Sequence, residues 1–197
     1  KKVILDCDNT KKKKEKDVDD ALAFLFFLGR EDMKLLGVSS VFGNSTIDDT
    51  YATTEKMLDD LALKDEIPHY KGAAEAGDYD TEAAEFLAEA AADNKGEITL
   101  VAVGAMSNLY GAWKIDKDFF KNLKEVIVMG GITDPLQIGD ETIDELNFSC
   151  DPEAAEKVLK AEVTVAVMSG NLCLAARFGE KSWRRVNRSK NKPIRAY

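Results

Sequence analysis

Residues 2–10 read Lys-Val-Ile-Leu-Asp-Cys-Asp-Asn-Thr, and this stretch decides the fold class. It starts as a continuous apolar run rich in β-branched residues, which is typical of a strand buried on both faces of a sheet. Runs of the same kind lie at Lys34–Val41, Ile98–Val103, Glu125–Met129 and Val163–Met168, with Ile67–Tyr70 as a short sixth. Between them the sequence predicts helices over Asp19–Leu28, Ile47–Leu61, Thr81–Ala92, Asn108–Ile115, Pro152–Lys160 and Lys181–Arg188. This alternation predicts one α/β domain over residues 1–197, with a doubly wound, mostly parallel sheet flanked by helices on both faces.

The composition is that of a folded, acidic protein. The chain has 197 residues, of which 45% are hydrophobic, and its net charge is −9. Such a charge opposes binding to the phosphate backbone of nucleic acids, and no apolar run approaches the roughly 20 residues of a membrane span. The three cysteines form no C-x-x-C pair and are expected to be reduced, without zinc. We therefore expect a cytoplasmic protein without nucleic-acid or membrane partners.

Residues 9–18 form an inserted basic loop that interrupts the pattern. Residues 11–16 of this loop read Lys-Lys-Lys-Lys-Glu-Lys. A block of like charges is typical of a solvated, flexible loop. A lid that closes over an anionic or polar ligand is the alternative.

Acidic residues gather where the first strand ends. Asp6 and Asp8 are two positions apart and therefore face the same side of a strand. Asp19 and Asp20 open the next helix. Ligands of doubly wound sheets bind outside the carboxyl ends of the strands, and several carboxylates at one such end are best compensated by a hard divalent cation. The sequence therefore predicts a metal site here.

Polar residues that follow other strands add a second feature. Asn44 follows the second strand, whereas Glu145 and Asn147 lie in the loop after Met129-Gly130-Gly131. Each alone is compatible with a turn or helix cap. Together at one edge of the sheet, they indicate a pocket for a polyhydroxylated sugar.

A series of short motifs follows in order: Asp6-x-Asp8, Asp19-Asp20-Ala21, Gly43-Asn44, Gly104-Ala105-Met106-Ser107-Asn108, Met129-Gly130-Gly131, Glu145-Leu146-Asn147 and Asp151-Pro152-Glu153-Ala154-Ala155. In this order, over nearly the whole chain, they resemble the nucleoside hydrolases, the calcium-dependent N-ribohydrolases of the inosine-uridine-preferring type. The resemblance implies a Rossmann-like fold, bound Ca²⁺ and hydrolysis of ribonucleosides to ribose and free base. It also implies a role in purine and pyrimidine salvage and a homo-oligomer, either a dimer or a tetramer.

The resemblance also implies roles for particular residues. The implied calcium ligands are Asp8, Asp20, the backbone carbonyl of Val103 and, as a further candidate, Asp6. Asp8 is also the implied catalytic base that activates the attacking water. The implied ribose-binding residues are Asp19, Asn44, Glu145 and Asn147. A carboxylate-rich pocket suits this chemistry, because positive charge develops on the sugar in the transition state.

The chain departs from the family pattern in three places. The stretch 9–18 is longer than the usual spacer between the catalytic Asp and the Asp-Asp pair. Gly139 stands where many members have a ribose-binding Asn. The family's C-terminal third, which carries a further calcium-ligating Asp and often a His that assists the leaving base, has no counterpart. We therefore expect a C-terminally incomplete chain.

Two alternatives remain at this point. Asp6-Cys7-Asp8-Asn9-Thr10 also matches the D-x-D-x-T signature of haloacid-dehalogenase-like phosphatases. There Asp6 would be the nucleophile, Asp8 the acid/base, Ser40 a phosphate ligand and Mg²⁺ the metal. The other alternative is a domain that binds nucleoside or calcium without turnover.

Overall fold

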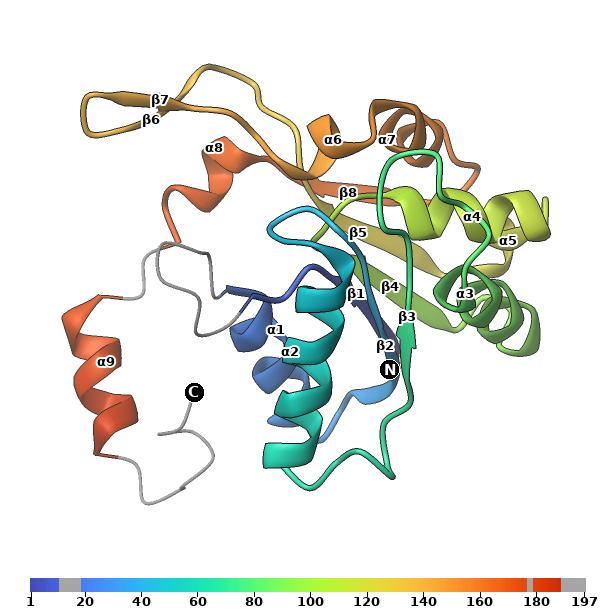
Figure 1. The fold of residues 1–197 in the computed structure, drawn as a ribbon, viewed down its shortest axis with the longest axis horizontal. Helices are drawn as coiled ribbons and strands as arrows, with labels where there is room; N and C mark the ends of the chain where they lie inside the picture. The colour runs from blue at the N-terminus through green and yellow to red at the C-terminus, as the bar shows by residue number, and fades with distance from the viewer. Residues whose placement is uncertain (11–18, 177–178, 189–197) are drawn as a thin grey trace.

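The computed structural model describes residues 1–10, 19–176 and 179–188, and its main feature is a six-stranded parallel sheet (Figure 1). The strands are β1 (Lys2–Cys7), β2 (Lys34–Ser40), β3 (His69–Lys71), β4 (Ile98–Ala102), β5 (Glu125–Met129) and β8 (Val165–Met168). Their spatial order is β3-β2-β1-β4-β5-β8. The chain therefore builds outward from β1 in one direction and then in the other, which confirms the predicted doubly wound α/β fold.

The helices predicted from the sequence all form. They are α1 (Asp19–Leu28), α2 (Ile47–Asp60), α3 (Glu82–Asp93), α4 (Ser107–Ile115), α7 (Pro152–Leu159) and α9 (Glu180–Asn187). Each bound lies within one residue of the prediction. The short strand predicted at 67–70 appears as β3, shifted by one or two residues.

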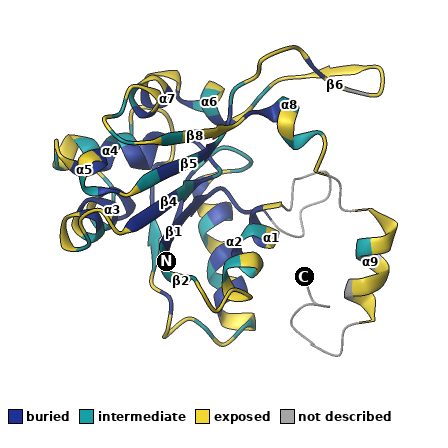
Figure 2. Ribbon diagram, turned by 180° about the vertical axis from the view of Figure 1, so that it is seen from behind, coloured by how far each residue is buried: buried dark blue, intermediate teal, exposed yellow. Residues whose placement is uncertain are grey.

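The central strands β1 and β4 are buried on both faces, as their apolar runs predict (Figure 2). The run predicted at 163–168 differs: β8 lies at the edge of the sheet, where a strand has only one neighbour, and three of its four residues are exposed. Ile4 packs in the cluster formed with α3, α4, α5 and α7, whereas its neighbour Leu5 packs in the cluster formed with α1 and α2. Both side chains are at most 1% exposed. Successive side chains of a strand point to opposite faces of the sheet. A strand whose two faces are both covered is therefore apolar at every position.

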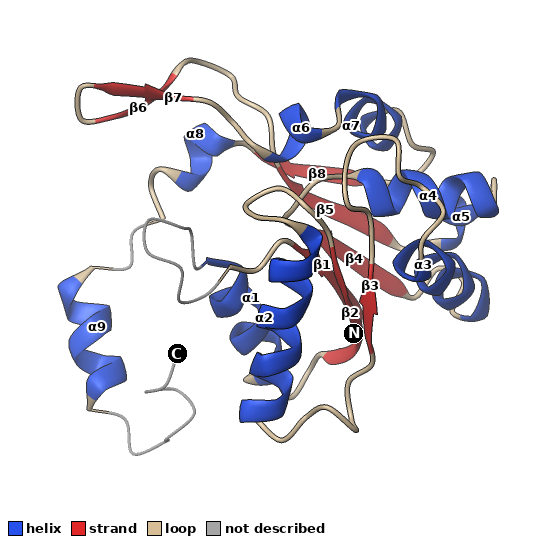
Figure 3. Cartoon of the chain, viewed as in Figure 1, coloured by secondary structure: helices blue, strands red, loops and turns tan. Residues whose placement is uncertain are grey.

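Several short elements are additions to the predicted pattern. They are the helices α5 (Phe119–Asn122), α6 (Asn147–Cys150) and α8 (Gly170–Cys173), and the antiparallel hairpin β6 (Leu136–Ile138) with β7 (Glu141–Ile143). Figure 3 shows this hairpin standing clear of the main sheet. Elements of three or four residues are too short to show a helical or strand period. Of the predicted basic loop, residues 11–18 lie outside the described residues.

Asp151 holds the start of α7 and joins it to two other segments. Its Oδ1 accepts hydrogen bonds from the Ala154 N–H at 3.1 Å and the Tyr79 hydroxyl at 3.3 Å. Its Oδ2 accepts one from the Ser107 hydroxyl at 2.6 Å. The carboxylate is therefore an N-cap and also ties α7 to α4 and to the loop before α3.

We expect Asp151→Ala to lower the free energy of unfolding by about 2–4 kcal/mol, because three donors lose their partner in a buried site. Urea denaturation followed by circular dichroism measures this. Asp118→Ala is the matched control, since Asp118 is the N-cap residue of α5 but makes no side-chain capping bond. Equal losses in the two variants would show that the Asp151 contacts are not stabilising.

Candidate active site

A cavity of about 370 Å³ opens at the carboxyl ends of β1, β4 and β5. It brings together residues from distant parts of the sequence, including the predicted site residues Asp8, Asp19, Asp20, Asn44, Val103, Glu145 and Asn147. Of the predicted site residues only Asp6 is absent from its lining. The position agrees with the rule that doubly wound folds bind ligands at this edge.

Asp8 and Asp20 form the acidic floor of the cavity. Asp20 Oδ2 accepts a hydrogen bond from the Asp8 N–H at 2.9 Å, and Asp8 Oδ2 accepts one from the Asn44 N–H at 2.5 Å. Burial raises the pKa of both carboxyl groups, and the negative charge of Asp19 raises both pKa values further. Within the described residues, neither carboxylate forms an ion pair with a basic side chain. The pair therefore lacks compensating positive charge in this part of the chain.

Asn147 and Glu145 form another part of the cavity wall. The Asn147 side-chain amide donates to the Val103 carbonyl at 2.9 Å and to the Met129 carbonyl at 3.0 Å, so it joins the ends of β4 and β5. The Glu145 carboxylate accepts from the Asn147 N–H at 2.6 Å and from the Phe148 N–H at 3.1 Å. These two of the four predicted ribose-binding residues thus shape the wall that they line.

Asp6 lies behind this floor rather than in the cavity. It is fully buried, and its Oδ1 accepts hydrogen bonds from the Ser39 hydroxyl at 2.5 Å and the Asn108 amide at 2.8 Å. Its Oδ2 has no hydrogen-bond partner among the described residues. Burial raises the pKa of Asp6 to about 7. An unpartnered buried oxygen is costly once the group ionises.

We expect Asp6→Asn to stabilise the protein increasingly as the pH rises. The folded-state pKa lies above the usual value, so wild-type stability falls between about pH 4 and pH 7, whereas an amide does not titrate. Between pH 4 and pH 8 the gain in unfolding free energy should grow by about 4 kcal/mol. Thermal melts from pH 4 to 8 measure it. Asp93→Asn, an exposed position on α3, should follow the wild-type curve, and a parallel curve for Asp6→Asn would refute the account.

The oxygen atoms around the cavity provide some of the ligands that a hard divalent cation needs. The carboxylates of Asp8 and Asp20 and the carbonyl of Val103 are the oxygen ligands that such cations prefer. The described residues contain no cluster of three or more His, Cys, Asp or Glu side chains arranged to hold a metal ion. The part of the site seen here is therefore two buried carboxylates and a carbonyl, with their negative charge uncompensated.

Part of the lining was not predicted from the sequence. An apolar wall comes from the end of β5, from the hairpin, from the loop before α6 and from the turn after α8, with the residues Met129, Leu136, Ile143, Leu146, Leu174 and Ala176. Leu136 is buried, and a Cβ on Gly170 would lie 2.8 Å from its Cδ1. Since these residues come from short elements and loops, their sequence carries no period that marks them as a wall.

The single histidine of the sequence, His69, does not line the cavity and packs against its neighbours instead. Its Nδ1 lies 3.0 Å from Glu55 Oε1 and its Nε2 lies 2.8 Å from the Ser40 hydroxyl. The ring stacks on Tyr51, and burial lowers the pKa of His69. Ser40 is completely buried, so its hydroxyl is not placed to bind a substrate phosphate.

Comparison with known proteins agrees with this fold. Residues 3–196 match the family described as inosine-uridine preferring nucleoside hydrolase, and the chain belongs to this family. It is 28% identical to a probable uridine nucleosidase 2 from Oryza sativa subsp. japonica, over 97% of this chain and 63% of that protein. It is 26% identical to the pyrimidine-specific ribonucleoside hydrolase RihB of Escherichia coli, over 87% of this chain and 60% of that protein.

Solved structures give the same fold. A plant nucleoside hydrolase, PpNRh1, superposes with a TM-score of 0.84 at 24% identity, covering 100% of this chain and 69% of that one. A purine-preferring ribonucleoside hydrolase from Gardnerella vaginalis gives 0.79 at 23% identity, covering 98% and 69%. The chain thus spans about three fifths of the length of the relatives it matches by sequence. In its described part, no helix has the length and apolar character to cross a membrane.

Proposed function

We propose that this protein hydrolyses the N-glycosidic bond of ribonucleosides, releasing ribose and free base. The observation that carries the proposal is the joint placement of Asp8, Asp20 and Asn44 in one cavity at the carboxyl end of the sheet. Membership of the nucleoside hydrolase family supports the same reaction. The phosphatase alternative is disfavoured, because its nucleophile, Asp6, is fully buried and does not line the cavity.

We further propose that the site takes Ca²⁺, held by Asp8, Asp20 and the Val103 carbonyl. When bound, the ion supplies positive charge that acidifies and orients a water molecule. Asp6 is a weaker candidate ligand than Asp8 and Asp20. Its Oδ2 has no hydrogen-bond partner among the described residues, but Asp6 does not line the cavity. The surplus of buried negative charge at Asp8 and Asp20 is the feature that favours a cation.

Asp8 is the proposed general base. Its carboxylate lines the cavity and has a raised pKa, which brings its basicity closer to that needed to accept a proton near neutral pH. The Asn44 N–H holds one of its oxygens, so the carboxylate is fixed in orientation before a substrate binds. Asp8 therefore takes the proton of the attacking water as the water adds to the anomeric carbon.

The other acidic and amide groups are assigned to the sugar. Asp19, Asn44, Glu145 and Asn147 are proposed to hold the ribose hydroxyls, which are donors and acceptors that such groups can match. The negative charges also stabilise the positive charge that develops on the sugar ring. The apolar wall of Leu136, Ile143 and Leu146 is proposed to face the base.

The remaining proposals follow from the reaction. A protein with this activity would serve purine and pyrimidine salvage in the cytoplasm, with a small-molecule ribonucleoside as its partner. We also propose that it forms a homo-oligomer, either a dimer or a tetramer, and that residues 1–197 belong to one α/β domain.

Release of reducing sugar from inosine, uridine and cytidine tests the reaction. The expected result is ribose release with calcium present and its loss after chelation. Magnesium-dependent cleavage of a phosphate ester without ribose release would favour the phosphatase instead. Nucleoside binding without any release of sugar would indicate a domain that binds but does not turn over.

A further inference from the structure

A second cavity, of about 360 Å³, is lined by α4, α5, α7 and the residues that follow α4 and α7. Its lining residues are Trp113, Lys117, Phe120, Lys121, Lys157, Lys160, Ala161 and Glu162. It lies away from the first cavity, as the position of α5 in its wall shows. The chain runs from α5 directly into the amino end of β5, where the Lys124 N–H donates to the Ile98 carbonyl at the start of β4. The second cavity is therefore near the amino ends of the strands, opposite the proposed active site.

Lysine side chains converge on an aromatic ring in this cavity. The Lys157 ammonium lies 3.4 Å from the centre of the Trp113 ring, and the Lys117 ammonium lies 3.7 Å from it. The Tyr110 ring stacks on Trp113, with 5.6 Å between ring centres. Contact with the ring attracts each cation, but it leaves two like charges beside the same indole.

The neighbouring lysines differ from these two in having carboxylate partners. Lys121 pairs with Glu162 at 3.0 Å and with Asp118 at 3.4 Å, and Lys160 pairs with Glu156. Across the part of the chain that the structure describes, Lys117 and Lys157 form no ion pair. The cavity thus presents two uncompensated cations on a protein whose net charge is −9.

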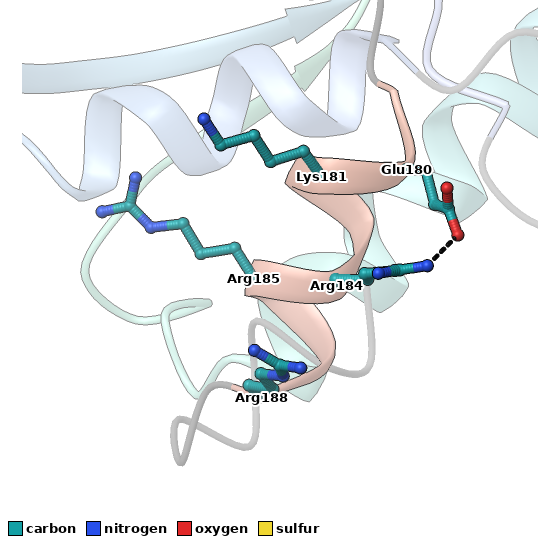
Figure 4. A pocket seen from close by; sticks show the side chains of 5 residues that line it. All are labelled: Glu180, Lys181, Arg184, Arg185 and Arg188. Carbon is teal, nitrogen blue, oxygen red and sulfur yellow. Dashed lines mark hydrogen bonds and ion pairs between the residues drawn. The ribbon is translucent and has the colours of Figure 1, made fainter.

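A basic helix elsewhere does not form a comparable site. Among the described residues, the hollow at the α9 segment is lined only by Glu180, Lys181, Arg184, Arg185 and Arg188, and Arg184 pairs with Glu180 at 2.6 Å (Figure 4). An exposed helix face of this kind is solvated. The cavity at Trp113 differs, because several elements build it and a buried ring, Phe120, forms part of its wall.

We propose that the cavity at Trp113 binds a small phosphate monoester, with Lys117 and Lys157 as ligands of the phosphate group. A dianionic phosphate would offset both ammonium charges, and lysine is a common phosphate ligand. The indole and Phe120 supply an apolar surface for the organic part of the ester. The inference is independent of nucleoside hydrolysis, since no residue of the proposed active site takes part.

Tryptophan fluorescence tests the proposal directly. Trp113 and Trp183 are the only tryptophans of the sequence, so Trp183→Phe leaves a single reporter beside the lysines. In this background, without added calcium, phenyl phosphate should give a saturable change and should bind more tightly than inorganic phosphate. Phenol, which lacks the charge, should give no saturable change at the same concentrations.

Charge variants identify the ligands. Lys117→Gln and Lys157→Gln should each weaken phenyl phosphate binding by about tenfold, as expected for loss of a charge-assisted contact. Lys95→Gln removes an equal charge from an exposed position before β4 and should change the affinity by less than about twofold.

Three outcomes would overturn the proposal. They are the absence of saturable binding, equal affinities for phenyl phosphate and inorganic phosphate, and equal weakening in Lys95→Gln and the two cavity variants. Isothermal titration calorimetry of the same variants checks that the fluorescence change reports binding. Circular dichroism confirms that each variant is folded.

Discussion

Asp8→Asn is expected to lower kcat/KM for ribonucleoside hydrolysis by at least about a thousandfold. The amide oxygen can still accept the hydrogen bond from the Asn44 N–H, so the local structure should persist. The amide cannot accept the proton of the attacking water, and it removes an anionic oxygen from the proposed calcium site. Steady-state release of ribose from inosine and uridine measures the effect.

The matched control for this variant is Asp59→Asn, which makes the same change at an exposed position of α2. It should keep the wild-type rate within about twofold, as surface substitutions remote from a site do. Without calcium, Asp8→Asn should melt at a higher temperature than the wild type, because one of two adjacent buried carboxylates is gone. An Asp8→Asn protein that retains wild-type kcat/KM would exclude Asp8 as the base.

Gly43→Ala is expected to lower kcat/KM by at least about a hundredfold, since small displacements of a catalytic group cost this much. A Cβ at Gly43 would lie 2.3 Å from Asp8 Oδ2, and the backbone φ of +146° is one that L-residues rarely adopt. The carboxylate or the loop must therefore move, and the bond from the Asn44 N–H to Asp8 is lost. Kinetics with inosine and uridine measure the loss.

Gly96→Ala separates the steric effect from backbone strain. Gly96 also has a positive φ, of +71°, but a Cβ there would meet no atom within 4 Å. This variant should lose about 1 kcal/mol of stability and keep its activity. Equal losses of activity in the two variants would show that the close approach of Gly43 to Asp8 is not the cause of the loss.

The sheet could be predicted because its strands carry a strong signal. The run from Val3 to Leu5 is apolar at every position, and the structure buries these side chains on both faces of β1. The hairpin of β6 and β7 was missed because strands of three residues carry no such pattern. The position of the hairpin depends on a tertiary contact, that of Leu136 with Gly170. Local sequence does not encode such a contact.

In the candidate site too, some residues could be predicted from the sequence and others could not. Asp8 directly follows β1, Asp20 lies in the first turn of α1, and Asn44 lies in the loop between β2 and α2. The rule for carboxyl ends of parallel strands was therefore enough to group them. The same rule grouped Asp6 with Asp8, whereas the structure turns Asp6 toward Ser39 and Asn108, outside the cavity lining. The inward or outward direction of a side chain at a strand end depends on the partner strands, which one stretch of sequence does not specify.

The most direct test of the central claim is a calcium titration of ribose release after the protein has been stripped with a chelator. We expect activity to return with calcium in a saturable way in the wild type, and to need at least about tenfold more calcium in Asp20→Asn. Ribose release that is insensitive to the chelator, or an unchanged calcium dependence in Asp20→Asn, would contradict the claim that Asp8 and Asp20 hold a catalytic cation.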